Sequence, residues 1–307
     1  MKAIKILPIL FIDLKKINMK EVILKIVYAF SIGGTGGNPA GVVLNADALS
    51  NKEKQSIAAK AGLSEVAFVS KSKVAEFKLE FFTPARQIAH CGHATIATFT
   101  YLKQQGLIKG ERSSKETIDG NRDIYFKNGF AYMEQKAPAY TTIESELPEI
   151  LGLLNLTMED LLTGYSPSIV NTGNSFLIVP VATNIVLKNL QPNLEKIKNY
   201  SEKHTLIGCY VFSSSNEIGI AATTRMFAPL YGIDEESATG MAAGPLACYL
   251  FDNNLTKETE LTIKQGEYMA KPSPSRINVS LQLEGGKIKK LFAGGDAFVA
   301  EEIRIRF

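Results

Sequence analysis

A glutamate at the start of an apolar segment is the first residue in this sequence that could do chemistry. Glu65 stands directly before VAFV (66–69), whose composition predicts a buried strand. A carboxyl group at the edge of such a strand is partly desolvated, and desolvation raises its pKa towards the working range of a general acid or base. The alternative is an ordinary solvated carboxylate. We expect Glu65 to take a proton from carbon and to return it.

The tetrapeptide HCGH (90–93) carries three more reactive side chains. The spacing of His90 and His93 suggests part of a metal site, but no further cluster of ligand residues accompanies it, so we expect no bound metal. His93 stands at the start of an apolar stretch, where a lone histidine is commonly a cap or a packing residue. Cys91 is interpreted as a small packing residue at the same helix start.

Two stretches of similar pattern, residues 92–102 and 240–250, are the elements that must position these groups. They read GHATIATFTYL and GMAAGPLACYL, and neither contains Asp, Glu, Lys or Arg. A helix that is apolar all round is buried. A Phe-x-Pro tripeptide precedes each stretch, and a Gly-Asn pair followed by a mainly apolar run occurs further upstream in both halves. Three blocks repeated in one order predict an internal duplication.

The N-termini of these two helices are candidate anion sites. The first N–H groups of a helix have no partner within it, and the helix dipole is positive there. The glycine that opens each helix would let a ligand approach those donors. Because duplication would bring the two ends towards one cleft, the N–H groups of Gly92–His93 and Gly240–Met241 are expected to hold a carboxylate. Capping by side chains or water is the alternative.

The composition indicates a globular protein whose partners are neither nucleic acids nor membranes. The 307 residues allow two domains, and the 45% hydrophobic and 21% charged fractions are those of soluble globular proteins. A net charge of +3 gives no reason to expect nucleic acid or an anionic membrane. The three cysteines lack paired spacing, which favours a reducing cytoplasm over a disulfide framework.

The order of apolar and polar segments predicts strands around one buried helix in each half. Alternating residues near the end of the chain predict two late strands. The expected elements are strands at 22–30 and 76–82, a polar helix at 50–61, a second polar helix near 190–204, and strands near 277–284 and 303–307.

These elements divide the chain into two lobes. We place the N-terminal lobe at residues 22–135, joined by the C-terminal strand 292–307, and the C-terminal lobe at 136–291. Residues 1–18 are interpreted as an extension outside the fold, because their apolar run is too short to span a bilayer and no small-residue cleavage site follows it.

Five ordered motifs resemble the PhzF-like family of phenazine-biosynthesis isomerases, within the diaminopimelate-epimerase fold superfamily. They are GNPAGVVL, LSEVAFVS, FFTPARQIAHCGHATIAT, NTGNSFLIV and IDEESATGMAAGPLA, and the similarity runs from about Ile26 to the C-terminus. The resemblance implies an α+β fold of two pseudo-symmetric lobes, each a curved, mostly antiparallel sheet wrapped around a central buried helix. It also implies an active site between the lobes, no metal, no nucleotide cofactor, and a homodimer.

The resemblance also implies roles for single residues. Glu65 occupies the position of the family's catalytic glutamate, and His93 that of its active-site histidine. Glu236 stands where the family usually has an aspartate, and Met241 where it has a serine. Gln87 stands where relatives often carry an acid. Asn38, in the first of the five motifs, is grouped with the substrate-binding or supporting residues.

The function expected from the sequence is that of a cofactor-independent isomerase of a small carboxylate-bearing metabolite. Glu65 shuttles a proton, His93 and Glu236 hold polar groups of the substrate or assist the transfer, and the two helix N-termini bind its carboxylate. The departures at Glu236, Met241 and Gln87 leave the substrate open.

Two other functions stay open on the sequence. One is an epimerase that pairs Glu65 with Cys91 or Glu236. A racemase with two thiols is disfavoured, because the duplication sets Thr239 opposite Cys91 and threonine is a poor base. The other is a small-molecule binding protein that keeps the cleft and has lost catalysis, which the changes at Met241 and Gln87 would allow.

Overall fold

The computed structural model describes residues 20–307, so the expected extension at 1–18 lies outside the described residues. In this part of the chain, hydrogen bonds connect the strands into one extended sheet. None of its helices is long and apolar enough to cross a membrane. The helices are α1 (Asn51–Ala61), α2 (Gly92–Gln104), α3 (Leu147–Leu154), α4 (Asn184–Lys188), α5 (Leu194–His204) and α6 (Gly240–Asp252).

The strands follow one another mainly as antiparallel neighbours. Three neighbouring pairs, β2–β3, β11–β12 and β13–β15, are parallel, as is the short pairing β4–β6. The strands are β1 (Glu21–Ala29), β2 (Asn38–Val43), β3 (Val66–Lys71), β4 (Phe77–Phe82), β5 (Gln87–Ile88), β6 (Arg112–Thr117), β7 (Gly120–Lys127), β8 (Phe130–Lys136), β9 (Ala139–Thr141), β10 (Ser168–Asn171), β11 (Ser175–Pro180), β12 (Gly208–Ser214), β13 (Ala222–Ala228), β14 (Ile233–Glu236), β15 (Glu260–Gln265), β16 (Ser275–Glu284), β17 (Lys287–Gly295) and β18 (Ala297–Arg306).

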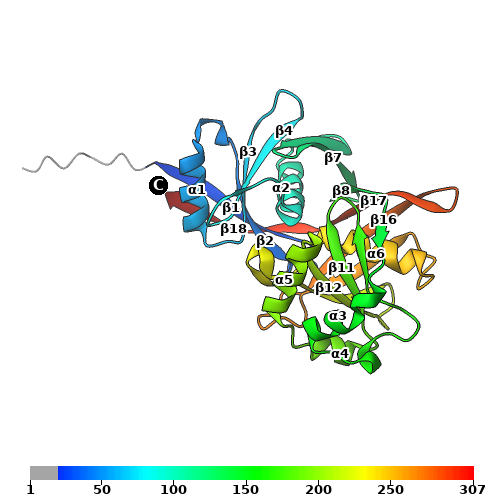
Figure 1. Ribbon diagram of the computed structural model, residues 1–307. Coiled ribbons are helices and arrows are strands. Elements are labelled where there is room, and N and C mark those ends of the chain that lie inside the picture. The colour runs from blue at the N-terminus through cyan, green and yellow to red at the C-terminus, as the bar shows by residue number, and fades with distance from the viewer. Residues whose placement is uncertain (1–19) are drawn as a thin grey trace, which may run out of the picture.

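In the first lobe, the sheet curves around α2 (Figure 1). β1 pairs with β2 on one side and with β18 on the other, so the last strand of the chain lies beside the first. α2 packs against β1, β2, β8 and β18, and every residue from Gly92 to Leu102 is buried. The polar helix α1 covers the outer face of the same sheet, where it contacts β3, β4 and β18.

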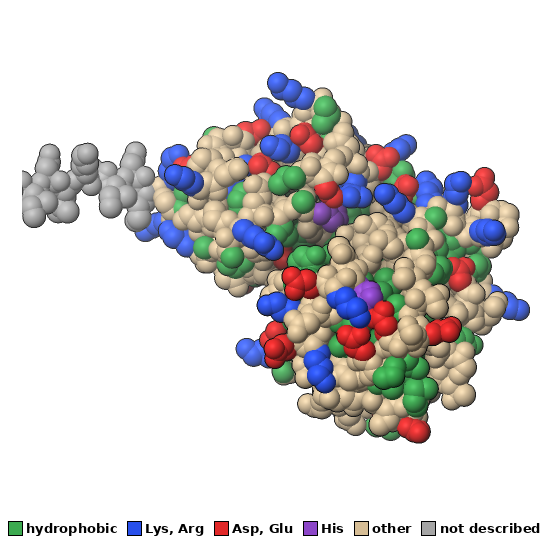
Figure 2. Space-filling model, viewed as in Figure 1, with side chains coloured by type: hydrophobic (Ala, Val, Ile, Leu, Met, Phe, Trp, Pro, Cys, Tyr) green, Lys and Arg blue, Asp and Glu red, His purple; other side chains and the backbone are tan. Residues whose placement is uncertain are grey.

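In the second lobe, α6 packs against β10, β11, β16 and β17 (Figure 1). β17 pairs antiparallel with β8 of the first lobe, and this pairing makes the two sheets continuous. The buried side chains of α2 and α6 belong to one hydrophobic core. On the face shown in Figure 2, basic and acidic side chains are interspersed and form no patch of one sign.

The boundaries of the predicted helices follow their caps. α1 begins after Ser50, whose side chain accepts a hydrogen bond from the Glu53 N–H in a capping box. The polar helix expected near 190–204 is present as α5, which begins at Leu194 and ends at His204, and the short helix α4 before it was not expected. The start of α5 is set by Asn193, whose side chain accepts a hydrogen bond from the Lys196 N–H, and Pro192 stands directly before this cap.

Glycines in α6 allow close contact with neighbouring segments. A Cβ atom built on Gly240 would lie 2.8 Å from the Phe30 ring, and one built on Gly244 would lie 2.2 Å from Gln135 Oε1 and 2.7 Å from Leu291 Cδ1. Phe30 itself has a φ of 61°, a left-handed conformation that is uncommon for an aromatic residue. A side chain at Gly240 would therefore have to displace the Phe30 ring, and one at Gly244 the ends of the Gln135 and Leu291 side chains.

Replacing Gly244 with alanine tests this packing. An exposed helix would gain up to about 1 kcal/mol from the change, but overpacking in a core costs about 1–3 kcal/mol. We expect Gly244→Ala to lower the free energy of unfolding, measured by urea denaturation. Gly110→Ala is the control, because an added Cβ there has no neighbour closer than 3.9 Å. Equal stability of Gly244→Ala and the wild type would contradict the assigned contact.

Candidate active site

A cavity of about 470 Å³ lies between the two lobes and contains the candidate residues. One wall comes from the first lobe, with the residue before β3 and the start of α2. The other wall comes from β13, β14 and the start of α6. The residues that line it are Ser64, Glu65, Thr83, Pro84, Ala85, Arg86, Ile88, His90, Cys91, Gly92, His93, Ile207, Met226, Ala228, Tyr231, Gly232, Ile233, Glu236, Ala238, Thr239, Gly240 and Met241.

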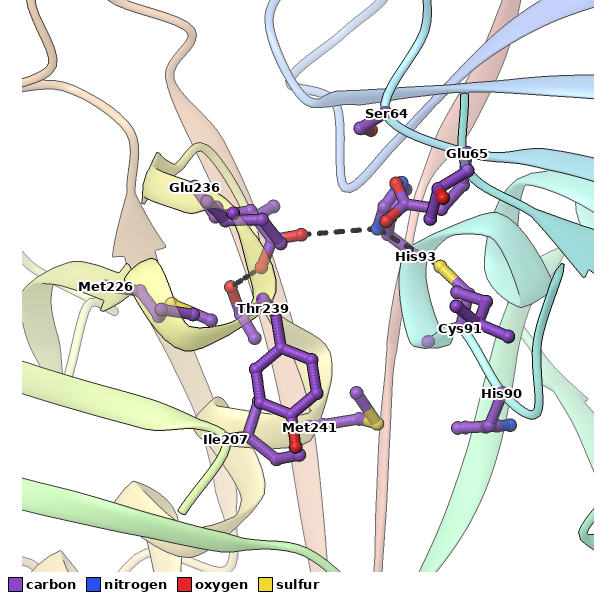
Figure 3. Close-up of a pocket in the computed structure, with 18 of the residues that line it drawn as sticks. Ser64, Glu65, His90, Cys91, His93, Ile207, Met226, Glu236, Thr239 and Met241 are labelled. Atoms are coloured by element: carbon purple, nitrogen blue, oxygen red, sulfur yellow. Dashed lines mark hydrogen bonds and ion pairs between the residues drawn. The ribbon is translucent and has the colours of Figure 1, made fainter. Parts of the chain in front are cut away.

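His93 lies between two carboxylates that come from opposite lobes (Figure 3). Its Nε2 is 3.3 Å from Glu65 Oε2, and its Nδ1 is 3.4 Å from Glu236 Oε1. Glu65 directly precedes β3, His93 is the second residue of α2, and Glu236 ends β14. The structure thus brings together three residues that lie far apart in the sequence.

The charges of this cluster depend on one another. Burial lowers the pKa of His93, but Cys91, Glu236 and Glu65 together raise that pKa well above 6.5. Burial also raises the pKa of the Cys91 thiol, so at neutral pH the thiol supplies no negative charge to His93. The raised pKa favours the imidazolium form of His93 between the carboxylates of Glu65 and Glu236.

The expectation of a raised pKa at Glu65 is wrong. Burial is the largest influence and does raise it, but the charge and hydrogen bonding of His93 outweigh burial, so the pKa of Glu65 lies below 4.5. Sequence reasoning took account of the apolar strand and not of the cation across the cavity. Glu65 is consequently ionised at neutral pH and starts as a base.

Polar contacts from both lobes hold Glu236 in place. Asn38 Nδ2 at the start of β2 donates to Glu236 Oε1 at 2.9 Å and to the Ala238 carbonyl at 3.0 Å. The Thr239 hydroxyl donates to Glu236 Oε2 (Figure 3), and Gln265 Nε2 donates to the Glu236 carbonyl at 2.7 Å. Sequence reasoning treated Thr239 only as the counterpart of Cys91 and missed Gln265, because no motif marks the end of β15.

Several polar groups at the cavity have no aligned hydrogen-bond partner in residues 20–307. Glu65 Oε2 and His93 Nε2 are both buried and lack such a partner. The two atoms are 3.3 Å apart, but they are not aligned for a hydrogen bond with each other. Neither Cys91 nor Thr239 caps its helix with a side chain. Unpaired polar groups in a cavity are expected to bind ligand or water.

The two helix-opening glycines, which line the cavity, also pack against protein. A Cβ on Gly92 would lie 3.1 Å from Met241 Cγ, and the corresponding side of Gly240 faces Phe30. Close contact of Gly92 with Met241, and of Gly240 with Phe30, the residue after β1, is a second reason for small residues at these positions. Met241 covers Gly92 and accepts a weak contact from Asn174 Nδ2 at 3.5 Å from its sulfur.

Glu65, Cys91 and His93 also offer donor atoms that lie within 4.8 Å of one another. His90 is not in this group, so the group differs from the HCGH pair considered in the sequence. Binding of a metal there would require the Cys91 thiol and the His93 ring to release protons. The expected absence of a metal stays a prediction.

Comparison with solved structures identifies the class of fold. A solved Bacillus anthracis structure described as a phenazine biosynthesis protein of the PhzF family has a TM-score of 0.83 and 28% identity, covering 94% of this chain and 99% of that one. An Agrobacterium vitis hydroxyproline epimerase has a TM-score of 0.57 over 94% of this chain and 93% of its own, at 12% identity, and shows a similar fold. The fold is therefore epimerase-like, as expected from the sequence.

The sequence comparisons identify the family. The model of phenazine biosynthesis-like proteins, PhzC-PhzF, matches residues 27–302. An uncharacterized isomerase of Clostridium acetobutylicum is 34% identical over 81% of this chain and 86% of its own. A trans-2,3-dihydro-3-hydroxyanthranilate isomerase of Pseudomonas chlororaphis is 29% identical over 81% of this chain and 87% of its own. The chain belongs to the PhzC-PhzF family, and it is an isomerase.

The charge on His93 gives a testable pH dependence. A group whose folded-state pKa is raised stabilises the protein fully below its unfolded pKa, about 6.5, and this contribution is lost as pH rises through the folded-state pKa. We expect the difference in unfolding free energy between wild type and His93→Gln to be most favourable to the wild type near pH 6 and to shrink towards pH 9. Urea denaturation at each pH measures it. A difference that is constant or grows with pH would show that His93 is neutral.

Proposed function

We propose that the protein is a cofactor-independent isomerase that moves a proton within a small carboxylate-bearing metabolite in the cavity between the lobes. The observation that carries this proposal is the position of the His93 ring between the carboxyl groups of Glu65 and Glu236. The ionised Glu65 takes a proton from a substrate carbon, the C–H electron pair shifts the double bond, and the protonated Glu65 returns the proton to another carbon. His93 stabilises the negative charge that develops.

The substrate carboxylate is proposed to bind at the N-termini of α2 and α6. The N–H groups of Gly92, His93, Gly240 and Met241 are the donors there, and both helices present their positive ends to the cavity. Asn38, Thr239 and Gln265 support this arrangement by fixing Glu236.

The name of the Pseudomonas relative supplies a first substrate for testing, trans-2,3-dihydro-3-hydroxyanthranilate. This compound bears a carboxylate and has a carbon-bound proton next to a conjugated system, which is the chemistry that the cavity suits. Met241 lies at the proposed carboxylate site and Glu236 opposite Glu65, so these departures are where a different substrate preference would arise.

An epimerase is the second candidate, and one observation favours it. Glu65 and Glu236 approach His93 from opposite lobes, so a substrate beside His93 could meet one carboxylate from each lobe. Entry of solvent deuterium with inversion at the same carbon would identify the epimerase, and transfer to another carbon would identify the isomerase.

The remaining expectations belong to the same proposal. We propose the lobes 22–135 with 292–307 and 136–291, a homodimer and a cytoplasmic location. Support for the duplication comes from α2 and α6, which have thirteen residues each and begin at the paired Gly92 and Gly240.

The role of Glu65 is tested by hydrogen exchange between the substrate and deuterated water. Glu65→Gln keeps the shape of the side chain and removes the base, so turnover and exchange should fall about 100- to 10,000-fold. Mass spectrometry of the product measures both. Glu111→Gln, which alters a largely exposed carboxylate, should behave as the wild type. Undiminished exchange in Glu65→Gln would remove Glu65 from the mechanism.

The carboxylate site is tested with a matched pair of ligands, anthranilate and anthranilamide. Each helix N-terminus contributes about 0.3–1 kcal/mol to the binding of a negative charge. The acid should therefore bind roughly 3- to 30-fold more tightly than the amide, as measured by calorimetry. Equal affinities of the two compounds would contradict the proposed carboxylate site.

A further inference from the structure

Lys115, in the middle of β6, is fully buried and plays no part in the proposed proton transfer. Its Nζ is 2.7 Å from Thr95 Oγ1 and 3.0 Å from His90 Nδ1, and it lies 5.2 Å from the centre of the Phe81 ring. Within residues 20–307, no carboxylate lies within ion-pair distance of it. A buried ammonium without a carboxylate partner is costly, so these two contacts call for an explanation.

The directions of the hydrogen bonds follow from Thr95. Its hydroxyl donates to the Cys91 carbonyl at 2.6 Å, so the hydroxyl oxygen accepts from Lys115. A lysine ammonium has only donors, and His90 Nδ1 must then accept from it. A neutral imidazole that accepts at Nδ1 carries its proton on Nε2.

His90 is also part of the cavity wall. It lies beside Cys91 in Figure 3 and lines the same cavity as Glu65 and His93. Lys115 reaches its Nδ1 from the fully buried side, which leaves Nε2 without a protein partner in the described chain. Because His90 lines the cavity, a ligand bound there can reach its ring.

We propose that Lys115 and His90 form a hydrogen-bond donor subsite of the cavity, in which His90 Nε2–H binds an uncharged oxygen acceptor of the ligand, such as a hydroxyl or carbonyl group. This inference rests on the proposed function and adds a second recognition point to it, separate from the carboxylate site. His90 determines specificity by direct contact, and Lys115 is a positioning residue.

The protonation of both groups agrees with this arrangement. Burial and the neighbouring Lys115 hold the pKa of His90 well below 6.5, so its ring is neutral. Burial, and then Arg122, lower the pKa of Lys115 to about 7, while Asp119 and Cys91 act in the opposite direction. Above that pH the neutral amine can accept from Nδ1–H, the other tautomer forms, and the donor in the cavity is lost.

The tautomer of His90 tests the subsite without any ligand. In protein labelled with ¹⁵N-histidine, long-range proton–nitrogen spectra at pH 6 should show a protonated Nε2 and an unprotonated Nδ1, and this preference should disappear as pH rises through about 7. In Lys115→Met the preference should be weak at every pH. Methionine fits the site and removes a buried charge, so the variant should fold. A protonated Nδ1 in the wild type at pH 6, or identical spectra for the two proteins, would overturn the proposal.

The consequence for recognition is measured with trans-2,3-dihydro-3-hydroxyanthranilate. Loss of one hydrogen bond should raise KM roughly 2- to 13-fold in His90→Phe and Lys115→Met, with a smaller effect on kcat. His90→Gln retains a donor near the Nε2 position and should restore KM. His204→Gln, outside the cavity, is the control. Unchanged KM in His90→Phe would contradict the subsite, whereas a wild type that does not turn over this compound contradicts only the proposed substrate, and the tautomer still decides the inference.

Discussion

The ion pairs of the buried His93 are the interaction on which the cavity depends. Taking an ion out of water costs several kcal/mol unless partners compensate, and the two compensating carboxylates come from different lobes. The lobes must therefore stay in register. The β17–β8 pairing and the hydrogen bonds of Asn38 to Glu236 and Ala238 maintain that register. Loss of His93 would leave both carboxylates without their shared ion-pair partner, whereas loss of either carboxylate would leave His93 paired with the other.

The sequence predicted those features that local patterns determine. We predicted β3, α2 and α6 because burial of a strand or helix is visible in its own residues. They correspond to the apolar run after Glu65 and to the uncharged stretches that begin at Gly92 and Gly240. The pKa of Glu65 was predicted with the wrong sign, because it depends on a cation from another element. Lys115 was not singled out, because it lies in the polar segment RSSKET, where a lysine ordinarily faces solvent.

The three residues that depart from the family pattern differ in whether they line the cavity. Met241 and Glu236 line the cavity, whereas Gln87 lies outside the residues that line it and is 3.5 Å from Asn51 on α1 through its amide oxygen. Met241 brings a thioether to the helix end where a hydroxyl would donate a hydrogen bond, so it can change substrate preference without altering the Glu65–His93 pair. We infer that Gln87 affects packing between β5 and α1, and that specificity varies at Met241 and Glu236.

A neutron crystal structure near pH 7 would test the central claim most directly, because it locates the exchangeable hydrogens of the cluster. The account predicts deuterium on both Nδ1 and Nε2 of His93 and none on the carboxylate of Glu65. A neutral His93 with a protonated Glu65 would contradict it, since Glu65 would then lack the charge needed to accept a proton from carbon.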